Sequence, residues 1–210
     1  MTIVKKAFKF YSLPFYILTH PFDGFYDMKY QGKGTLKLAL LNLFLVCLSY
    51  AFNNQYASIV VNPQNPLAMN SIFDVATILG TLLLFCVANW SVTSLTNGEG
   101  RVKDIFMAVC YAMTPLILTI IPAAILSNFI SQEEAGFYYM LMAIGVIYFV
   151  FLVFSGLVVV HNYTAGKAIL TIFLTFFAIL VIVFLLMLLL TLWQQLFVFA
   201  YSVYTEIMFR

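Results

Sequence analysis

The sequence predicts an all-α integral membrane protein, built as a bundle of five transmembrane helices with short interfacial helices before the first span. Of the 210 residues, 64% are hydrophobic and only 9% are charged, whereas soluble domains are about half apolar and about a quarter charged. One small globule cannot hide an apolar surplus this large, so most of the surface is expected to face lipid. Five apolar stretches and a one-sided distribution of basic residues give the bundle its number of spans and its orientation.

Each predicted span is long enough to cross a bilayer, since a hydrocarbon core about 30 Å thick takes about 20 apolar residues in a helix. Three regions follow from them: an interfacial N-terminal segment at 1–34, a five-helix domain at 35–193, and an aromatic extension at 194–210 that continues the fifth helix into the outer interface. The five spans are Thr35–Asn53, Ile72–Leu95, Ile105–Ile130, Phe137–Val160 and Ala168–Trp193.

The segment before the first span is expected to lie on the membrane surface. In residues 3–13, Lys5, Lys6 and Lys9 share one helical face, which is typical of a helix lying against anionic headgroups. The basic start is not followed by a long apolar core and a small-residue cleavage site, so we do not expect a removable signal peptide.

The stretch "HPFDGFYDMKYQGKG" at residues 20–34 invites comparison with a phosphate-binding loop. A Walker A loop places Gly-Lys-Ser/Thr after a strand, whereas here Lys33 is followed by Gly34 and no strand is expected before it. Pro21 instead suits the first turn of a helix, so we expect a short interfacial helix that turns into the first span through the glycines. Its lipid-facing side chains are expected to be Phe22, Phe25 and Tyr26.

Lysine and arginine residues lie on one side of the predicted bundle. Nine of the ten precede the first span, lie in its first turn or fall in the second and fourth loops, and the third loop carries Glu133 and Glu134 instead. The positive-inside rule then predicts a multi-pass protein of the plasma membrane, with its N-terminus cytoplasmic and its C-terminus outside. The nine residues are Lys5, Lys6, Lys9, Lys29, Lys33, Lys37, Arg101, Lys103 and Lys167.

Composition and spacing argue against several functions. A net charge of +2 is too mild to indicate a nucleic-acid partner. The three cysteines fall in apolar runs without a CxxC pair, which predicts neither a disulfide framework nor a zinc site. We find no catalytic triad pattern, no carboxylate pair within a span and no dinucleotide loop, so we expect neither a cofactor nor enzymatic activity.

Two histidines give a weaker, metal-based hypothesis. His20 and His161 both fall on the predicted inner side, where a third ligand would come from Asp23, Asp27 or Asp104. No HExxH-type spacing supports such a site, so ordinary interfacial histidines are the favoured interpretation. A metal-dependent intramembrane enzyme remains the third-ranked hypothesis.

A few polar residues fall inside the spans. Asp74 lies three residues after Ser71, which predicts a helix cap in preference to a proton or ion site. Asn42 and Asn89 are expected to form hydrogen bonds between helices.

The third span contains Pro115 and Pro122, seven residues apart and nearly on one face. Each proline removes an intrahelical hydrogen bond, so the helix is expected to bend. Thr114 and Thr119 are placed to take up the freed carbonyls. The bend predicts either a cavity or hinge, or simply a shaped bundle.

The second loop and third span read "NGEGRVKDIFMAVCYAMTPLIL", a Gly-rich turn and a charged stretch followed by a Y-x-x-x-P motif. This pattern resembles the Yip1 family of five-span membrane proteins, and Tyr111, Thr114 and Pro115 match the motif that opens the family's third helix. The "HPFDGFYDM" stretch is similar to the segment before the helices of prokaryotic members. The resemblance covers about residues 18–192 and implies a prokaryotic-type member.

What the resemblance implies about function is limited. Eukaryotic members of the family work in vesicle traffic, associate with Rab GTPases and form hetero-oligomers. They carry a long polar N-terminal region with an Asp-Leu-Tyr-Gly-Pro motif, whereas this chain has about 34 residues before its first span and reads "DGFYD". A Rab-binding role is therefore not expected.

The leading hypothesis is a non-enzymatic polytopic protein that acts as a partner or assembly subunit of a larger membrane complex, with a transport complex as the favoured setting. The alternative is a small transporter or lipid-handling protein with a cavity at the Pro115–Pro122 bend. Expected partners are the lipid bilayer and other integral membrane subunits or a second copy of the chain. The predicted cytoplasmic docking face consists of His20, Pro21, Phe22, Phe25, Lys29, Lys33, Arg101 and Lys103.

Overall fold

The computed structural model describes residues 12–63 and 70–209, and within them the chain is helical with short connections. The predicted amphipathic lysines of residues 3–11 and the terminal Arg210 lie outside the described residues. The helices are α2 (Ser12–Thr19), α3 (Pro21–Lys29), α4 (Leu36–Tyr56), α5 (Ser71–Leu95), α6 (Val102–Ala112), α7 (Thr114–Ser127), α8 (Ala135–His161) and α9 (Ala165–Met208).

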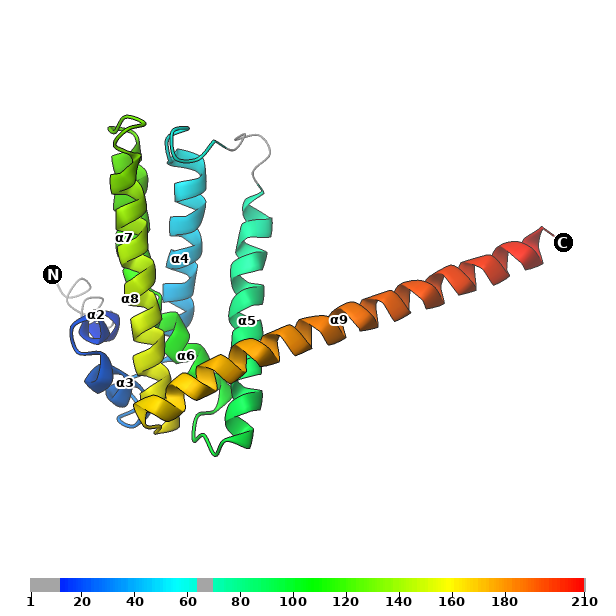
Figure 1. The fold of residues 1–210 in the computed structure, drawn as a ribbon, viewed down its shortest axis with the longest axis horizontal. Coiled ribbons are helices and arrows are strands. Elements are labelled where there is room, and N and C mark those ends of the chain that lie inside the picture. Colours follow the sequence, from blue (N-terminus) through cyan, green and yellow to red (C-terminus); the bar gives the residue numbers. More distant parts are fainter. Residues whose placement is uncertain (1–11, 64–69, 210) are drawn as a thin grey trace.

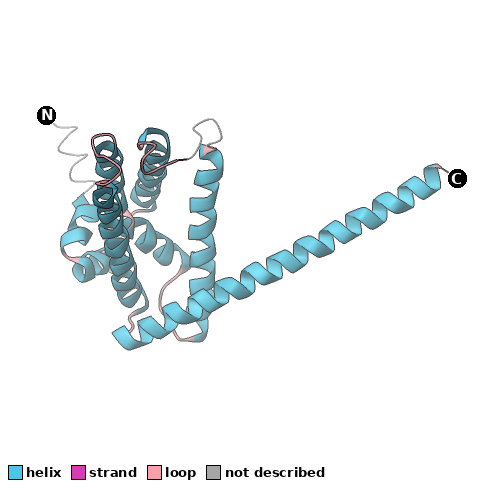
Figure 2. Ribbon diagram, turned by 45° about the horizontal axis from the view of Figure 1, so that its top comes forward, coloured by secondary structure: helices cyan, strands magenta, loops and turns pink. Residues whose placement is uncertain are grey.

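Five helices of the described chain are long and apolar enough to cross a membrane, when α6 and α7 are taken together as one span at Val102–Ser127. Helices α4, α5, α7 and α8 run side by side (Figures 1 and 2). This confirms the predicted fold class. The predicted third and fourth spans differ from the observed helices by a few residues at their ends, and α9, with 44 residues, contains both the predicted fifth span and most of the predicted extension.

The connections between the helices gather at two ends of the bundle (Figure 1). The α3–α4, α5–α6 and α8–α9 connections meet at one end, which we call the basic end. The opposite end carries the α4–α5 and α7–α8 connections, with Asp74, Glu133 and Glu134. The basic end is named for its lysines and arginine, which are Lys29, Lys33, Lys37, Arg101, Lys103 and Lys167.

Helix α6 is the centre of the bundle. It packs against α4, α5 and α8, and every residue from 107 to 115 is buried. A helix surrounded in this way must be apolar on all sides, which the sequence "MAVCYAMTP" satisfies. The first half of the third span is therefore the core of the protein.

Helix α3 packs along α8, and the end of α2 contacts the middle of α8. The hydroxyl of Tyr148, at the middle of α8, donates to the carbonyl of Leu18, and the ring of Phe25 lies against Gly156. At the basic end, Lys29 Nζ donates to the carbonyl of Val160 at 2.7 Å. These helices thus follow α8 from its middle to its end.

The prediction that all three aromatic side chains of the interfacial helix face lipid is wrong for one of them. Phe22 and Tyr26 are about half exposed, but Phe25 is fully buried. Gly156 has no side chain, so α3 approaches α8 closely and the Phe25 ring fills the space above the glycine. The prediction failed because it took all three aromatic residues to face lipid.

Helix α9 leaves the bundle (Figure 1, orange to red). Its contacts with the rest of the chain are mainly with α5, and its buried residues are Ala168, Thr171 and Thr175, all in its first quarter. At a rise of about 1.5 Å per residue it is about 66 Å long, roughly twice the thickness of a hydrocarbon core. The predicted extension after Trp193 continues this same helix.

Candidate functional site

The third span is broken between α6 and α7. Pro115 has no backbone N–H, so the carbonyl of Tyr111 loses its usual helical partner. The hydroxyl of Thr114 donates to that carbonyl at 2.7 Å. Helix α7, in contrast, continues through Pro122 to Ser127. The hydroxyl of Thr119 donates to Pro115 and Leu116 instead of to the carbonyl that Pro122 leaves free.

The break is filled from the neighbouring first span. Asn42 of α4 is fully buried, and its Nδ2 donates to the carbonyl of Cys110 at 2.5 Å and to the hydroxyl of Thr114 at 3.2 Å. Met113, Thr114 and Pro115 are themselves buried. Among the described residues, side chains therefore fill the space at Pro115, whereas Pro122, at the other end of the predicted cavity, is exposed.

Tyr111 connects the break to the start of α4. Its ring is fully buried, and its hydroxyl donates to the carbonyl of Thr35 at 2.9 Å and accepts from the N–H of Thr35 at 3.0 Å. Thr35 is the N-cap of α4, and its hydroxyl accepts from Leu38 N at 3.4 Å. Tyr111 and Thr114 thus fix α4 against α6 at two levels.

The family model of the Yip1 domain matches residues 15–204, from α2 almost to the end of α9. The chain belongs to the Yip1 family. No curated protein and no solved structure matches the chain. The match includes the Tyr111-x-x-Thr114-Pro115 motif. The side chains of Tyr111 and Thr114 in this motif form the hydrogen bonds described above for the core of this Yip1 domain.

A polar cluster, which we call the Glu99 cluster, closes the basic end of the Yip1 domain. Glu99 lies in the α5–α6 loop and accepts hydrogen bonds from Asn162 (3.3 Å) and from the Tyr30 hydroxyl (3.1 Å). The ammonium of Lys29 lies 3.4 Å from Glu99 Oε2, the same oxygen that accepts from Tyr30. These hydrogen bonds and the Lys29 charge lower the pKa of Glu99 below its ordinary value. One carboxylate thus joins α3, the α5–α6 loop and the end of α8.

A buried hydrogen-bond chain, the His161 chain, lies beside this cluster. The N–H of Gly100 donates to His161 Nδ1 at 3.3 Å, so the ring proton is assigned to Nε2, which lies 3.1 Å from the side-chain oxygen Oδ1 of Asn89. Asn89 Nδ2 donates to the Thr175 hydroxyl at 3.1 Å, which donates to the carbonyl of Thr171 at 2.8 Å. The chain fastens α9 to α5 and α8.

Two glycines of the α5–α6 loop make room for His161. An added Cβ at Gly98 would lie 2.7 Å from His161 Nδ1, and one at Gly100 would lie 2.6 Å from His161 Cε1. The ring of Tyr163 stacks on that of His161, with 5.3 Å between ring centroids. The Gly-rich turn therefore serves close packing on the histidine.

The two histidines of the metal hypothesis lie at different levels of α8. His20 is two residues after Leu18, whose carbonyl accepts a hydrogen bond from the Tyr148 hydroxyl of α8. His20 therefore lies near the level of Tyr148. His161 lies thirteen residues further along α8, or about 20 Å. His20 contacts Thr19 and Tyr16. Among the described residues, no group of three or more metal-type ligands forms. The His20–His161 hypothesis is therefore wrong in its geometry.

The predicted docking face divides into two parts. Phe25 is fully buried and Lys29 has a side chain only 11% exposed, so both are structural. Lys33 is exposed and forms an ion pair with Asp27 at 2.6 Å. The residues of the prediction that remain accessible are His20, Pro21, Phe22, Lys33, Arg101 and Lys103.

Sequence reasoning also misplaced one cap and missed one residue. Asn70, not Ser71, caps α5 by accepting from Ile72 and Phe73, while Asp74 accepts from Asn54 Nδ2 at 2.9 Å. Glu99 was not singled out, although its position between two glycines was a signal that the loop packs closely.

Proposed function

We propose that this Yip1 domain protein acts as a non-enzymatic partner or assembly subunit of a larger membrane complex, with a transport complex as the favoured setting. The observation that carries the proposal is α9. Only 6% of the most apolar 18-residue stretch of α9 is buried within the protein, whereas the corresponding share is 56% for the third span and 44% for α4. A helix this long, packed only at its start, offers an extended surface to other membrane helices.

The orientation belongs to the same proposal. Because cytoplasmic loops are enriched in Lys and Arg, we place the basic end in the cytoplasm of a cell whose plasma membrane holds the protein. A fifth crossing by α9 then puts the C-terminus outside. Cysteines introduced in place of Lys103 and Glu133 test this, since a membrane-impermeant thiol reagent added to intact cells should label only the position of Glu133.

The accessible part of the predicted docking face supports a cytoplasmic contact. Arg101 and Lys103 lie at the start of α6, and both are exposed. Phe22 is exposed on α3, which reaches the same end of the bundle. Exposed cationic side chains suit both anionic headgroups and an acidic partner surface.

Purification in mild detergent, followed by mass spectrometry of crosslinked partners, tests the proposal. We expect a reproducible membrane partner that is lost with the double variant Arg101→Glu, Lys103→Glu. The matched control is Glu133→Lys, Glu134→Lys, which reverses the same number of charges at the opposite end and should retain the partner. A chain that purifies alone, with no crosslinked partner, would contradict the assembly role.

A further inference from the structure

The turn between α2 and α3 lies at the level of the middle of α8. The hydroxyl of Tyr148 donates to the carbonyl of Leu18, next to this turn. Tyr148 is fourteen residues from each of the two caps of α8, Glu134 and Asn162, which is about 21 Å along the helix in either direction. Half of a hydrocarbon core is about 15 Å thick, so Tyr148 and Leu18 lie near the middle of the membrane.

Helix α3 runs from that level to the basic end. Its Phe25 ring lies against Gly156, which is about 12 Å along α8 from Tyr148. Its last residue, Lys29, donates to the carbonyl of Val160, about 18 Å from Tyr148. Figure 1 shows α2 and α3 beside the half of the bundle that ends at the α8–α9 connection. The two helices therefore form a hairpin about as deep as one leaflet.

The hairpin has a polar face. Thr19, His20 and Asp23 are exposed, and Asp27, four residues after Asp23, is partly exposed. The buried hydrophobic side chains of the hairpin pack on the bundle instead. We call Thr19, His20, Asp23 and Asp27 the polar face.

The upper part of the polar face has no partner from another span. The carboxylate of Asp23 forms no hydrogen bond or ion pair within the described residues. His20 contacts Thr19 and Tyr16 of the preceding helix, and as the N-cap of α3 it makes no side-chain cap hydrogen bond. The first N–H groups of α3 therefore also need a partner from outside the helix.

Lipid cannot supply these partners. Asp23 comes between Leu18 and Phe25 in the chain. Its level therefore lies between the two points on α8 that these residues contact, within about 12 Å of the membrane middle. Ionisable side chains at such a depth face a polar interior or draw water into the bilayer. Since Asp23 is exposed, water is the surrounding that remains.

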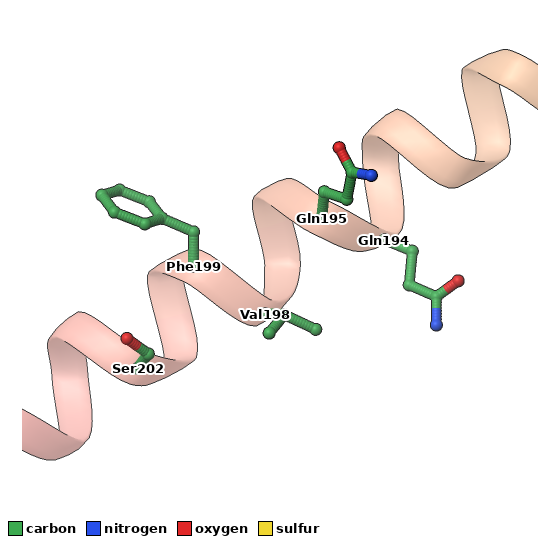
Figure 3. Close-up of a pocket in the computed structure, with 5 residues that line it drawn as sticks. All are labelled: Gln194, Gln195, Val198, Phe199 and Ser202. Carbon is green, nitrogen blue, oxygen red and sulfur yellow. The ribbon is translucent and has the colours of Figure 1, made fainter.

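The shallow groove on α9 is a separate surface. Its lining residues are Gln194, Gln195, Val198, Phe199 and Ser202 (Figure 3). The buried residues of α9 end at Thr175, so the groove lies on the part of the helix that projects away from the bundle (Figure 1). It does not contribute to the polar face of the hairpin.

We propose that α2 and α3 form a re-entrant hairpin in the leaflet at the basic end, and that its polar face holds a water-filled recess in the bilayer. Asp23 and Asp27 share one helical face, and Asp27 pairs with the exposed Lys33 at 2.6 Å, so charged groups continue from the recess to the basic end. A recess of this depth leaves about 15 Å of hydrocarbon for a lipid headgroup to cross. The proposal goes beyond the assembly role, and it gives the lipid-handling hypothesis a polar path away from the Pro115–Pro122 bend.

Thiol accessibility of the full-length protein in lipid nanodiscs tests the recess. A thiol reacts as its thiolate, so His20→Cys should react with a small cationic methanethiosulfonate at least about ten times faster than Val150→Cys. Val150 is the matched control, because it is 58% exposed and lies two residues from Tyr148, on the opposite face of α8 at a similar depth. The native cysteines are buried, so the parent chain gives the background. Both faces of a nanodisc are open to the reagent, so the result does not depend on which end is cytoplasmic.

Any other pattern overturns the proposal. Slow reaction at both positions would mean that the polar face lies against lipid. Fast reaction at both would mean that this level of α8 lies outside the hydrocarbon, with α2 and α3 on the membrane surface.

A second measurement removes the charge from the recess. Added to His20→Cys, Asp23→Leu should slow the reaction by about threefold or more, because lipid can then cover a face without an ionised group. The matched control is Phe22→Leu at the neighbouring exposed position, which keeps the charge and should keep the rate. Both positions are exposed, so the bundle should still fold. Equal rates in the two variants would mean that the polar face does not hold the water, and would overturn the proposal.

The recess and the assembly role fail separately, because the nanodiscs hold the purified chain alone. Fast modification of His20→Cys, with no crosslinked partner in native membranes, would support the recess and contradict the larger complex. A position that reacts in nanodiscs but is protected in native membranes would place a foreign subunit on the polar face. That result would overturn the open recess while supporting the assembly role.

Discussion

Asn42 Nδ2 lies 2.5 Å from the carbonyl oxygen of Cys110, so a side chain of the first span binds the backbone of the third span just before its break. The same nitrogen lies 3.2 Å from the hydroxyl of Thr114. One amide thus satisfies two acceptors where Pro115 interrupts the helix. The break between α6 and α7 is therefore stabilised by hydrogen bonds from α4.

Replacing Asn42 with leucine should destabilise the protein by about 1–2 kcal/mol, because both acceptors lose a buried donor while the side-chain volume changes little. Unfolding by SDS titrated into a mild detergent measures this loss. The control is Ser49→Ala on the same helix, because the hydroxyl of Ser49 donates only within α4, to Leu45. Equal losses in the two variants would contradict a special role for Asn42.

Tyr111→Phe should cost about 1–3 kcal/mol, since the N–H and carbonyl of Thr35 both lose the hydroxyl that pairs with them. The ring itself keeps its buried position. The loss should appear in the SDS titration and as faster hydrogen exchange in the first turn of α4. Tyr139→Phe removes a hydroxyl from a half-exposed ring and should change the stability little.

Hydropathy and prolines predicted much of this fold. Five spans follow from the length of the apolar stretches, and the break follows from the missing N–H of Pro115. The contacts between the spans were harder to predict, because a hydrogen bond such as that from Asn89 to Thr175 joins residues 86 positions apart. Phe25 was assigned to lipid because its burial depends on Gly156, more than a hundred residues away.

The path of α9 also escaped prediction. An apolar helix has the same hydropathy whether it packs in a bundle or leaves it, so the sequence cannot separate these cases. The Glu99 cluster was missed for a related reason. Glu99, Tyr30 and Asn162 come from three separate segments, and each is unremarkable alone. The exposure of Lys33, Arg101 and Lys103, in contrast, was expected from their charge, although the equally charged Lys29 is largely buried.

Gly100→Ala should destabilise the protein by about 1–3 kcal/mol, because the new methyl would lie 2.6 Å from both Val160 Cγ1 and His161 Cε1. Gly166→Ala is the matched control. That glycine lies in the first turn of α9 with nothing within 4 Å of an added Cβ, so alanine should leave stability equal or raise it by up to about 1 kcal/mol. Opposite signs in the SDS titration would support close packing of the loop on His161, and equal small effects would contradict it.

Glu99→Gln should change how stability depends on pH. The pKa of Glu99 is lowered in the folded protein by its hydrogen bonds to Asn162 and Tyr30 and by Lys29. A lowered folded pKa means that the carboxylate stabilises the fold above its ordinary pKa of 4.5, and that this contribution is lost as the pH falls through the lower folded value. The variant should therefore be less stable at neutral pH and lose less stability on acidification below about pH 5.

Unfolding midpoints in SDS, measured from pH 7 to pH 3.5, give the comparison. Glu133→Gln removes the same charge from the opposite end, and its profile should run parallel to that of the parent chain. If Glu99→Gln also runs parallel to the parent chain, the Glu99 cluster does not hold α3 and the end of α8 together. A profile that flattens only for Glu99→Gln would show that this carboxylate closes the basic end through the pairing of its ionised form.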